Sequence, residues 1–210
     1  MVQDNNNPLF ESTTIGGRAR RARLGMTLVE IMIVVLLLSI VAAMVIPNLS
    51  STNYDQLMAA AHIVQSEFSY TRSLAIANGS PYNLTFDTAN NQLIMTYSGT
   101  NSALNTLPST PFRNPSDPPN AQITAFNNLP NLNNSVAMVG AYLTSSGYPS
   151  CSAVQFGPLG NTLGATNSTV LYLYSGSGGS RLYISISVDP VTGLATVGTP
   201  TGSIPVSFGG

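Results

Sequence analysis

The chain has 210 residues, enough for one globular domain with an additional anchor. Charged residues make up only 7% of it and hydrophobic residues 43%, a balance that excludes a highly charged, disordered chain. Its single cysteine, Cys151, excludes an intramolecular disulfide and the CxxC and CxxCH patterns of metal clusters and haem attachment.

The few basic residues are concentrated near the N-terminus. All seven are arginines, and four of them fall between Arg18 and Arg23. If residues 1–25 are removed, three arginines face six acidic residues, which leaves a side-chain charge of −3. The remaining chain therefore lacks the basic footprint of a nucleic-acid-binding protein.

A basic leader precedes a long apolar segment. Residues 1–25 show no apolar period and end in the stretch GRARRARLG. Residues 26–46 (MTLVEIMIVVLLLSIVAAMVI) carry one charge, Glu30. As a helix, this segment would be about 30 Å long, the thickness of a bilayer core. Arginines on its N-terminal flank alone predict a single-pass membrane helix with a cytoplasmic N-terminus.

Three interpretations of this segment compete. A secretory signal peptide would be cut after the apolar run, where Ala42 and Ala43 offer a poor site. A plain membrane anchor does not account for Glu30, because a carboxylate in a lipid-facing helix costs about 2.5–3.5 kcal/mol. Cleavage between Gly25 and Met26 does account for it, since Glu30 would then lie one helical turn from a new α-amino group.

The residues Arg23 to Glu30 (RLGMTLVE) resemble the processing signal of type IV pilins and pseudopilins. The resemblance implies that prepilin peptidase cuts after Gly25 and methylates the amino group of Met26. Phe is commoner than Met at that position in this family, and the leader is often shorter. The resemblance also implies that Glu30 pairs with the N-terminus of an adjacent subunit and that Pro47 kinks the helix. The alternative role for Glu30 is a side chain that merely reaches the membrane interface.

Residues 47–78 form the second, amphipathic half of the predicted helix, with clear helical periodicity from residue 51. Asn78, Gly79 and Pro81 are expected to end it. Its apolar stripe consists of Leu57, Ala61, Val64, Phe68, Thr71 and Ala75. The opposite, solvated face is predicted to carry Asp55, Gln56, Gln65, Ser66 and Arg72.

From residue 79 the apolar period changes to two, which predicts a β-rich globular domain over residues 79–210. A long loop is predicted over 98–134 and a flexible Ser-Gly tract over 175–180. The expected antiparallel sheet would cover the stripe of the helix, giving an α+β fold. Its strands are predicted at 82–86, 92–97, 122–126, 136–143, 153–156, 169–174, 182–188 and 194–197.

Three short motifs narrow the family resemblance. They are Thr71–Ile76 (TRSLAI) with the strand that follows, Val154–Gly160 (VQFGPLG), and Arg181–Val197 with its Thr192-Gly193 pair. They resemble the helix end, the later turn and the closing hairpin of the GspH/FimT-like pseudopilins. The plain alternative is that Arg72 is a solvated helix residue and that the glycines belong to ordinary turns.

The resemblance implies a minor pilin or pseudopilin in a type II secretion pseudopilus or a type IV pilus. The expected location is the bacterial inner membrane, followed by a periplasmic or extracellular filament. The expected partners are prepilin peptidase, other pilins through the N-terminal helix, and the assembly platform in the inner membrane. The loop 98–134 is the expected contact surface. The alternatives are a major structural pilin or adhesin, and a FimT-like DNA-binding pilin, for which Arg181 is the available basic residue.

The sequence does not indicate an enzyme. It has no Gly-x-Ser-x-Gly element, no cluster of His and Cys, and no close pair of acids in the β-rich region. His62 has no second His or nearby Cys, so neither a metal site nor a cofactor is expected. Cys151 is expected to be a small residue of a loop or strand end.

Overall fold

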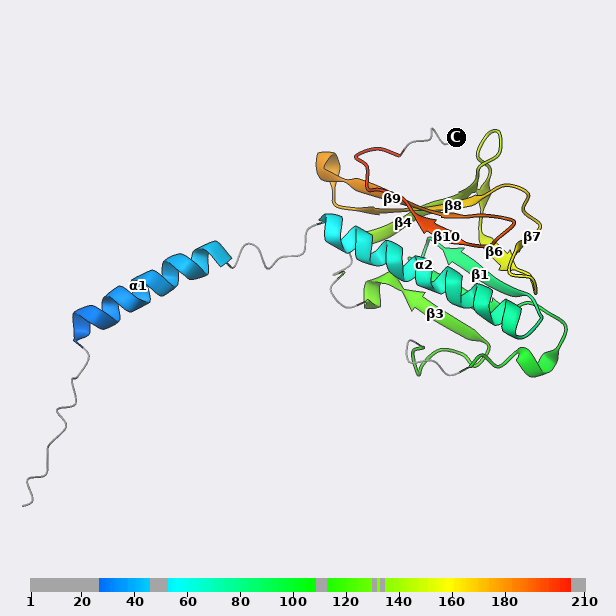
Figure 1. Ribbon diagram of the computed structural model, residues 1–210, viewed down its shortest axis with the longest axis horizontal. Helices are drawn as coiled ribbons and strands as arrows, with labels where there is room; N and C mark the ends of the chain where they lie inside the picture. The colour runs from blue at the N-terminus through cyan, green and yellow to red at the C-terminus, as the bar shows by residue number, and fades with distance from the viewer. Residues whose placement is uncertain (1–26, 46–52, 109–112, 130–131, 133–134, 205–210) are drawn as a thin grey trace, which may run out of the picture. The chain divides into compact units, whose positions relative to one another are not determined.

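The computed structural model describes residues 27–45, 53–108, 113–129, 132 and 135–204. The chain divides into two compact units, residues 1–49 and residues 50–210. The first unit contains helix α1, and the second contains helix α2 and the strands (Figure 1).

Helix α1 spans Leu28–Val45, within the apolar segment predicted over residues 26–46. Its apolar residues are spread around the whole circumference rather than along one stripe. Among the helices that the structure describes, none is both long and apolar enough to cross a membrane.

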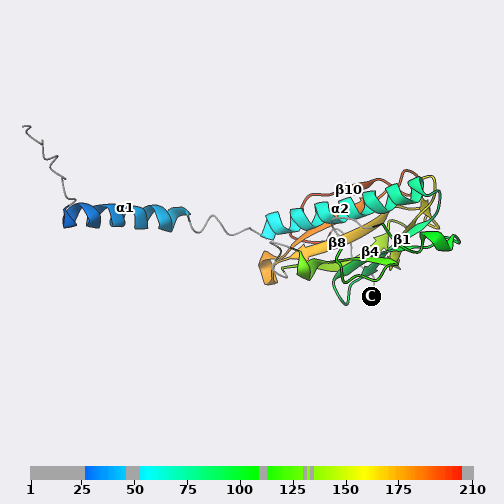
Figure 2. The same ribbon diagram turned by 90° about the horizontal axis from the view of Figure 1, so that it is seen from below.

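In the second unit, α2 (Asn53–Ala77) lies along one side of two antiparallel sheets (Figures 1 and 2). The first sheet has the order β3-β2-β1-β6-β7 and the second the order β10-β9-β8-β4-β5. Strands of the first sheet are β1 (Tyr82–Asp87), β2 (Gln92–Tyr97), β3 (Ala121–Ala125), β6 (Ala153–Phe156) and β7 (Thr162–Leu163). Strands of the second are β4 (Val136–Leu143), β5 (Ser150–Cys151), β8 (Thr169–Ser175), β9 (Leu182–Val188) and β10 (Ala195–Val197).

The α+β fold is confirmed, with a helix on antiparallel β-structure, but the strands form two sheets where one was expected. Strands β5 and β7 were not predicted, because two residues are too few to show a period. The predicted loop 98–134 contains, besides β3, the short 3₁₀ helices η2 (Ser102–Leu104) and η3 (Phe126–Asn128). A third, η4 (Gly178–Ser180), lies in the tract predicted to be flexible.

The core lies between α2 and the sheets, as the apolar stripe predicts. All six stripe residues of α2 are buried. Phe68 is at the centre of an aromatic group, with its ring edge-on to Phe86 at 6.0 Å and to Phe156 at 6.3 Å between centroids. Burying one such side chain stabilises the fold by about 1.5–3 kcal/mol, so this face of α2 holds the helix on the sheets.

The polar face of α2 differs from the prediction of a solvated surface. Asp55 and Ser66 are exposed as expected. Gln65, however, donates through Nε2 to the carbonyl oxygen of Ala195 at 2.8 Å, and Gln56 accepts a hydrogen bond from the hydroxyl of Ser135. Two polar residues that flank the stripe therefore bond to β10 and to the loop residue before β4.

Candidate functional site

The first turn of α1 carries the Thr-Leu-Val-Glu element of the N-terminal motif. Thr27 caps the helix: its Oγ1 accepts a hydrogen bond from the backbone N–H of Glu30 at 3.3 Å. Its carbonyl oxygen accepts from the N–H of Glu30 and of Ile31, at 3.1 and 3.2 Å. A threonine followed three residues later by glutamate is the spacing of a capping box. Glu30 is thus placed in the positively polarised first turn, with an exposed side chain.

Helix α1 has an exposed, apolar surface. Every described side chain from Leu28 to Val41 is exposed. Ser39 does not interrupt this surface, because its hydroxyl donates to the carbonyl oxygens of Val35 at 2.9 Å and Leu36 at 2.8 Å. A helix that is apolar all round needs apolar surroundings, which lipid or other subunits can supply.

The predicted cleavage site between Gly25 and Met26 and the predicted kink at Pro47 lie outside the described residues. They remain predictions, as does the role of Glu30 in subunit register.

In the second unit, the three short motifs of the sequence meet at one arginine. Arg72, in the last turns of α2, donates through Nε to the carbonyl oxygens of Gly160 at 3.1 Å and Thr192 at 2.8 Å. Gly160 ends the motif of residues 154–160, and Thr192 lies in the hairpin between β9 and β10. We call Arg72, Gly160, Thr192 and Gly193 the Arg72 junction. Arg72 is therefore half-buried and engaged, rather than a solvated helix residue.

The two glycines of the Arg72 junction are required by its geometry. Gly160 has a φ of +80° and Gly193 a φ of +65°, conformations that other residues rarely adopt. A Cβ at Gly193 would overlap the carbonyl oxygen of Gly160. A Cβ at Gly160 would lie 2.8 Å from Cδ1 of Ile76 and 3.0 Å from Nε of Arg72. Only glycine lets the two loops and the helix come this close.

Asp189 shapes the hairpin that reaches Arg72. Its Oδ1 accepts from the N–H groups of Val191 at 3.1 Å and Thr192 at 2.7 Å, and from the Thr192 hydroxyl at 2.8 Å. The hydrogen bond from the Thr192 backbone is the main reason that the pKa of Asp189 lies below its usual range. This turn fixes Thr192, so its carbonyl oxygen can accept the bond from Arg72.

A buried carboxylate, Glu67, was not singled out by the sequence analysis. It accepts hydrogen bonds from Nε2 of Gln122 at 3.0 and 3.2 Å and from the Thr124 hydroxyl at 2.7 Å. Burial raises the pKa of Glu67, and these hydrogen bonds partly offset that rise. The signal was available: position 67 is three residues after Val64 and four before Thr71, which places it on the buried stripe. These hydrogen bonds connect Glu67 of α2 with β3.

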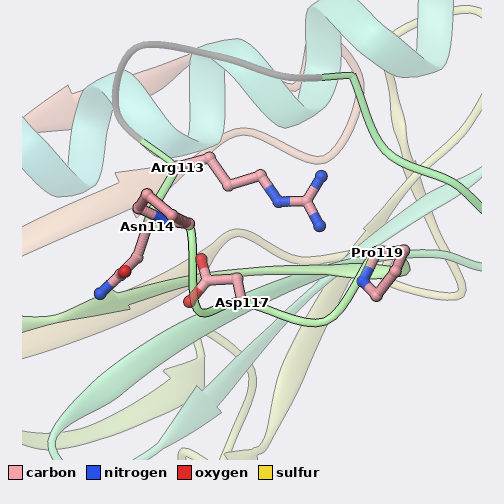
Figure 3. A pocket seen from close by; sticks show the side chains of 5 residues that line it. Arg113, Asn114, Asp117 and Pro119 are labelled. Carbon is pink, nitrogen blue, oxygen red and sulfur yellow. The ribbon is translucent and has the colours of Figure 1, made fainter.

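The loop before β3 contains a hollow of about 360 Å³, lined by Arg113, Asn114, Pro115, Asp117 and Pro119 (Figure 3). Arg113 donates to the carbonyl oxygens of Leu107, at 3.2 Å, and Pro118. Asp117 Oδ2 accepts from the N–H of Ile123 at 3.0 Å. The charged groups of this hollow thus hold the loop itself together, and the contact role predicted for 98–134 remains a prediction.

The structure also describes the surroundings of Cys151, His62 and Arg181. Cys151 is half-buried on β5, and burial raises the pKa of its thiol. His62 is exposed, with a ring nitrogen 3.3 Å from Oε1 of Gln65. Arg181 stacks over the ring of Tyr174 at 4.6 Å. Within the described ranges, His, Cys, Asp and Glu nowhere form a group of three or more that would hold a metal ion.

Comparisons with known proteins bear on the N-terminal motif. Residues 20–46 match the family described as "Prokaryotic N-terminal methylation motif". This range includes Gly25, Met26 and Glu30, so the motif noted in the sequence lies within the matched residues. A search of curated proteins finds no match.

Two solved structures are similar to the chain. Both are crystal structures of the type IV minor pilin FimU of Pseudomonas aeruginosa (strain PAO1), in different space groups. The first is 12% identical over 70% of this chain and 90% of that one, with a TM-score of 0.42. The second is 13% identical over 68% of this chain and 92% of that one, with a TM-score of 0.41.

Proposed function

We propose that this chain is a minor pilin or pseudopilin, processed by prepilin peptidase and built into a type IV pilus or a type II secretion pseudopilus. The observation that carries the proposal is the match of residues 20–46 to the N-terminal methylation motif. The structure of α1 supports it, because a helix that is apolar on every side and exposed in the single chain suits a filament core or a membrane.

Processing would prepare the chain for assembly. Residues 26–46 anchor the precursor in the inner membrane, with the basic leader on the cytoplasmic side. Cleavage after Gly25 removes four of the seven arginines and creates an α-amino group at Met26. Prepilin peptidase then methylates that group, and the assembly platform in the inner membrane moves the subunit into the filament.

Glu30 would set the axial register of the subunits. A carboxylate surrounded by apolar helices is strongly disfavoured unless a positive group neutralises it. The α-amino group of a neighbouring subunit's Met26 is such a partner, and a misplaced subunit would leave both charges unpaired. The Thr27 cap holds Glu30 in the first helical turn, close to the new terminus.

Substitution of Glu30 tests the proposal in the native host. The full chain, tagged at its C-terminus, is expected in sheared filaments, whereas Glu30→Ala is expected to be processed normally but to be depleted from filaments about tenfold or more. Ser39→Ala is the matched control, because the Ser39 hydroxyl bonds only to its own helix in the described structure. Absence of the wild-type chain from every filament fraction would refute the function, and normal incorporation of Glu30→Ala would refute the register role alone.

A further inference from the structure

A buried carboxylate joins helix α2 to the edge of the first sheet. Glu67 of α2 is only 9% exposed. It accepts hydrogen bonds from Nε2 of Gln122 at 3.0 and 3.2 Å and from the hydroxyl of Thr124 at 2.7 Å. Both donors lie on β3, which is next to α2 (Figure 1). We call Glu67, Gln122 and Thr124 the Glu67 cluster.

Strand β3 can separate from α2 while the core stays closed. Among the described strands it is the end strand of its sheet and pairs with β2 alone. The loop before it is bonded to the strand itself, because Asp117 accepts a hydrogen bond from the N–H of Ile123. Just after the strand, Phe126 is 1% exposed and belongs to the core. Residues 113–125 therefore form an edge segment that can open locally without moving Phe126, and the Glu67 cluster links this segment to α2.

The partners of Glu67 in the cluster are uncharged. Gln122 contributes an amide and Thr124 a hydroxyl, so neither neutralises an ionised carboxylate. A protonated Glu67 keeps both contacts, because it still accepts from the amide and its own O–H can donate to the hydroxyl oxygen of Thr124. Burial disfavours the ionised form, and this desolvation raises the pKa of Glu67 although the two donors partly offset the rise. The closed cluster therefore binds a proton more tightly than an exposed carboxyl group does.

Other titratable groups lie on the elements around the Glu67 cluster. Burial raises the pKa of Tyr70 on α2 and of Tyr82 on β1 above the ordinary value of 10.0, so both phenols are neutral in acidic and neutral solution. In the loop before β3, Arg113 donates to the carbonyl oxygens of Leu107 and Pro118, and Asp117 bonds to the backbone. Strand β2 carries no charged side chain. The charge state of the cluster thus depends mainly on Glu67 itself.

We propose that the Glu67 cluster is a pH-sensitive switch, which holds β3 on α2 when Glu67 is protonated and releases it when Glu67 is ionised. The contribution of Glu67 is complete below its ordinary pKa of 4.5 and is lost as the pH rises through the raised pKa of the folded state. Residues 113–125 belong to the loop 98–134, so the pH would determine how firmly that loop is held. The inference goes beyond the proposed function and does not depend on filament assembly.

Hydrogen exchange followed by mass spectrometry tests the switch in the full, detergent-solubilised chain. Exchange is measured from pH 4.5 into the mildly alkaline range, and protection factors remove the intrinsic pH dependence of amide exchange. In the wild type, the protection of residues 113–125 is expected to fall with rising pH, by at most about tenfold per pH unit, the limit for one proton. It is expected to be lower than the protection of β9 at every pH, because β3 opens locally.

Substitutions test whether the Glu67 carboxyl group is the sensor. Glu67→Gln keeps an acceptor but cannot ionise, so the protection of residues 113–125 should not vary with pH. Thr124→Val keeps the shape of the side chain but removes a donor that lowers the pKa of Glu67, so the fall in protection should move to higher pH. Thr96→Val on β2 is the matched control and should give the wild-type profile, because position 96 faces away from the buried Leu93 and Met95.

Three results would overturn the switch. Identical pH profiles for the wild type and Glu67→Gln would show that Glu67 is not the group that titrates. Equal protection of β3 and β9 at every pH would show that β3 opens only when the whole unit unfolds. A fall in Thr124→Val at the same pH as in the wild type would show that the Thr124 hydroxyl does not act on the titrating carboxyl group, whereas a packing role alone would leave that pH unchanged.

Discussion

Single residues of α2 decide how the helix is joined to the sheets. Phe68 fills the core, Glu67 bonds to β3, and Arg72 bonds to two loops. The three contacts differ in character. Phe68 packs through an apolar ring, Glu67 bonds through a buried carboxylate that can take up a proton, and Arg72 bonds through a cation to neutral carbonyl oxygens. The last two lead to different predictions.

The buried carboxylate of Glu67 should make stability depend on pH. Because burial raises the folded-state pKa of Glu67 above its ordinary value of 4.5, its contribution is complete below that value and is lost as the pH rises through the folded pKa. In Glu67→Gln, position 67 cannot ionise. Urea unfolding of the detergent-solubilised chain at a series of pH values should therefore show the wild type losing more stability than Glu67→Gln toward neutral pH. Parallel profiles would show that Glu67 does not titrate in this way.

Arg72 should act through its geometry more than through its charge. Hydrogen bonds to a charged group are each worth about 1.5–3 kcal/mol, so Arg72→Ala should lower the free energy of unfolding by at least about that amount. Arg72→Lys keeps the charge but places a methylene group where Nε donates to Gly160 and Thr192, so it should lose most of the same stability. Ser73→Ala, at an exposed neighbouring position, is the control for urea unfolding. Full stability of Arg72→Lys would mean that charge alone suffices.

At the scale of elements, the apolar periodicity of the sequence predicted the helix α2 and the longer strands. Helix α2 follows the stripe closely, β9 has the predicted limits 182–188, and β4 the predicted limits 136–143. A two-residue strand such as β7 has no period, and its pairing with β6 depends on the turn that brings Gly157 back to Asn161. The division into two sheets depends on pairings between distant segments, which a local pattern does not contain.

The candidate residues were predictable to different degrees, because a local pattern shows some of them directly and others come together only in the tertiary fold. Glu30 lies in a contiguous motif that the sequence displays directly. Arg72, Gly160 and Gly193 were each noted within separate motifs, but their meeting point follows from the tertiary fold. Glu67 was missed because a carboxylate is usually exposed, although its position on the stripe predicted burial.

A side chain should be tolerated much less at Gly193, in the hairpin between β9 and β10, than at Gly164, a glycine of comparable backbone conformation. Gly193 and Gly164 both have positive φ, +65° and +76°, and alanine at either position should cost about 1–2 kcal/mol. Only at Gly193 does the added Cβ also overlap a backbone carbonyl oxygen, that of Gly160. Gly193→Ala should therefore lower the melting temperature clearly more than Gly164→Ala. Equal losses would show that the two loops are not packed together as closely as described.

At the scale of the whole molecule, the chain consists of an apolar helix unit and a globular unit with its own core. The globular unit buries its apolar stripe against two sheets and is complete in that respect. Helix α1 leaves its described apolar side chains exposed, so the chain requires lipid or other subunits to cover them. The proposed function would meet this need, because a membrane before assembly and a filament core after it both offer apolar surroundings.

The N-terminus of the protein extracted from membranes tests this account most directly. Mass spectrometry of the terminal peptide should find a chain that begins at Met26 with a methylated α-amino group, because we propose cleavage after Gly25 within the motif matched over residues 20–46. Deletion of the host's prepilin peptidase should leave the leader attached and serves as the control. A chain from wild-type cells that still begins at Met1, or one that is cut after residue 42, would contradict the proposal that this protein is a processed pilin-like subunit.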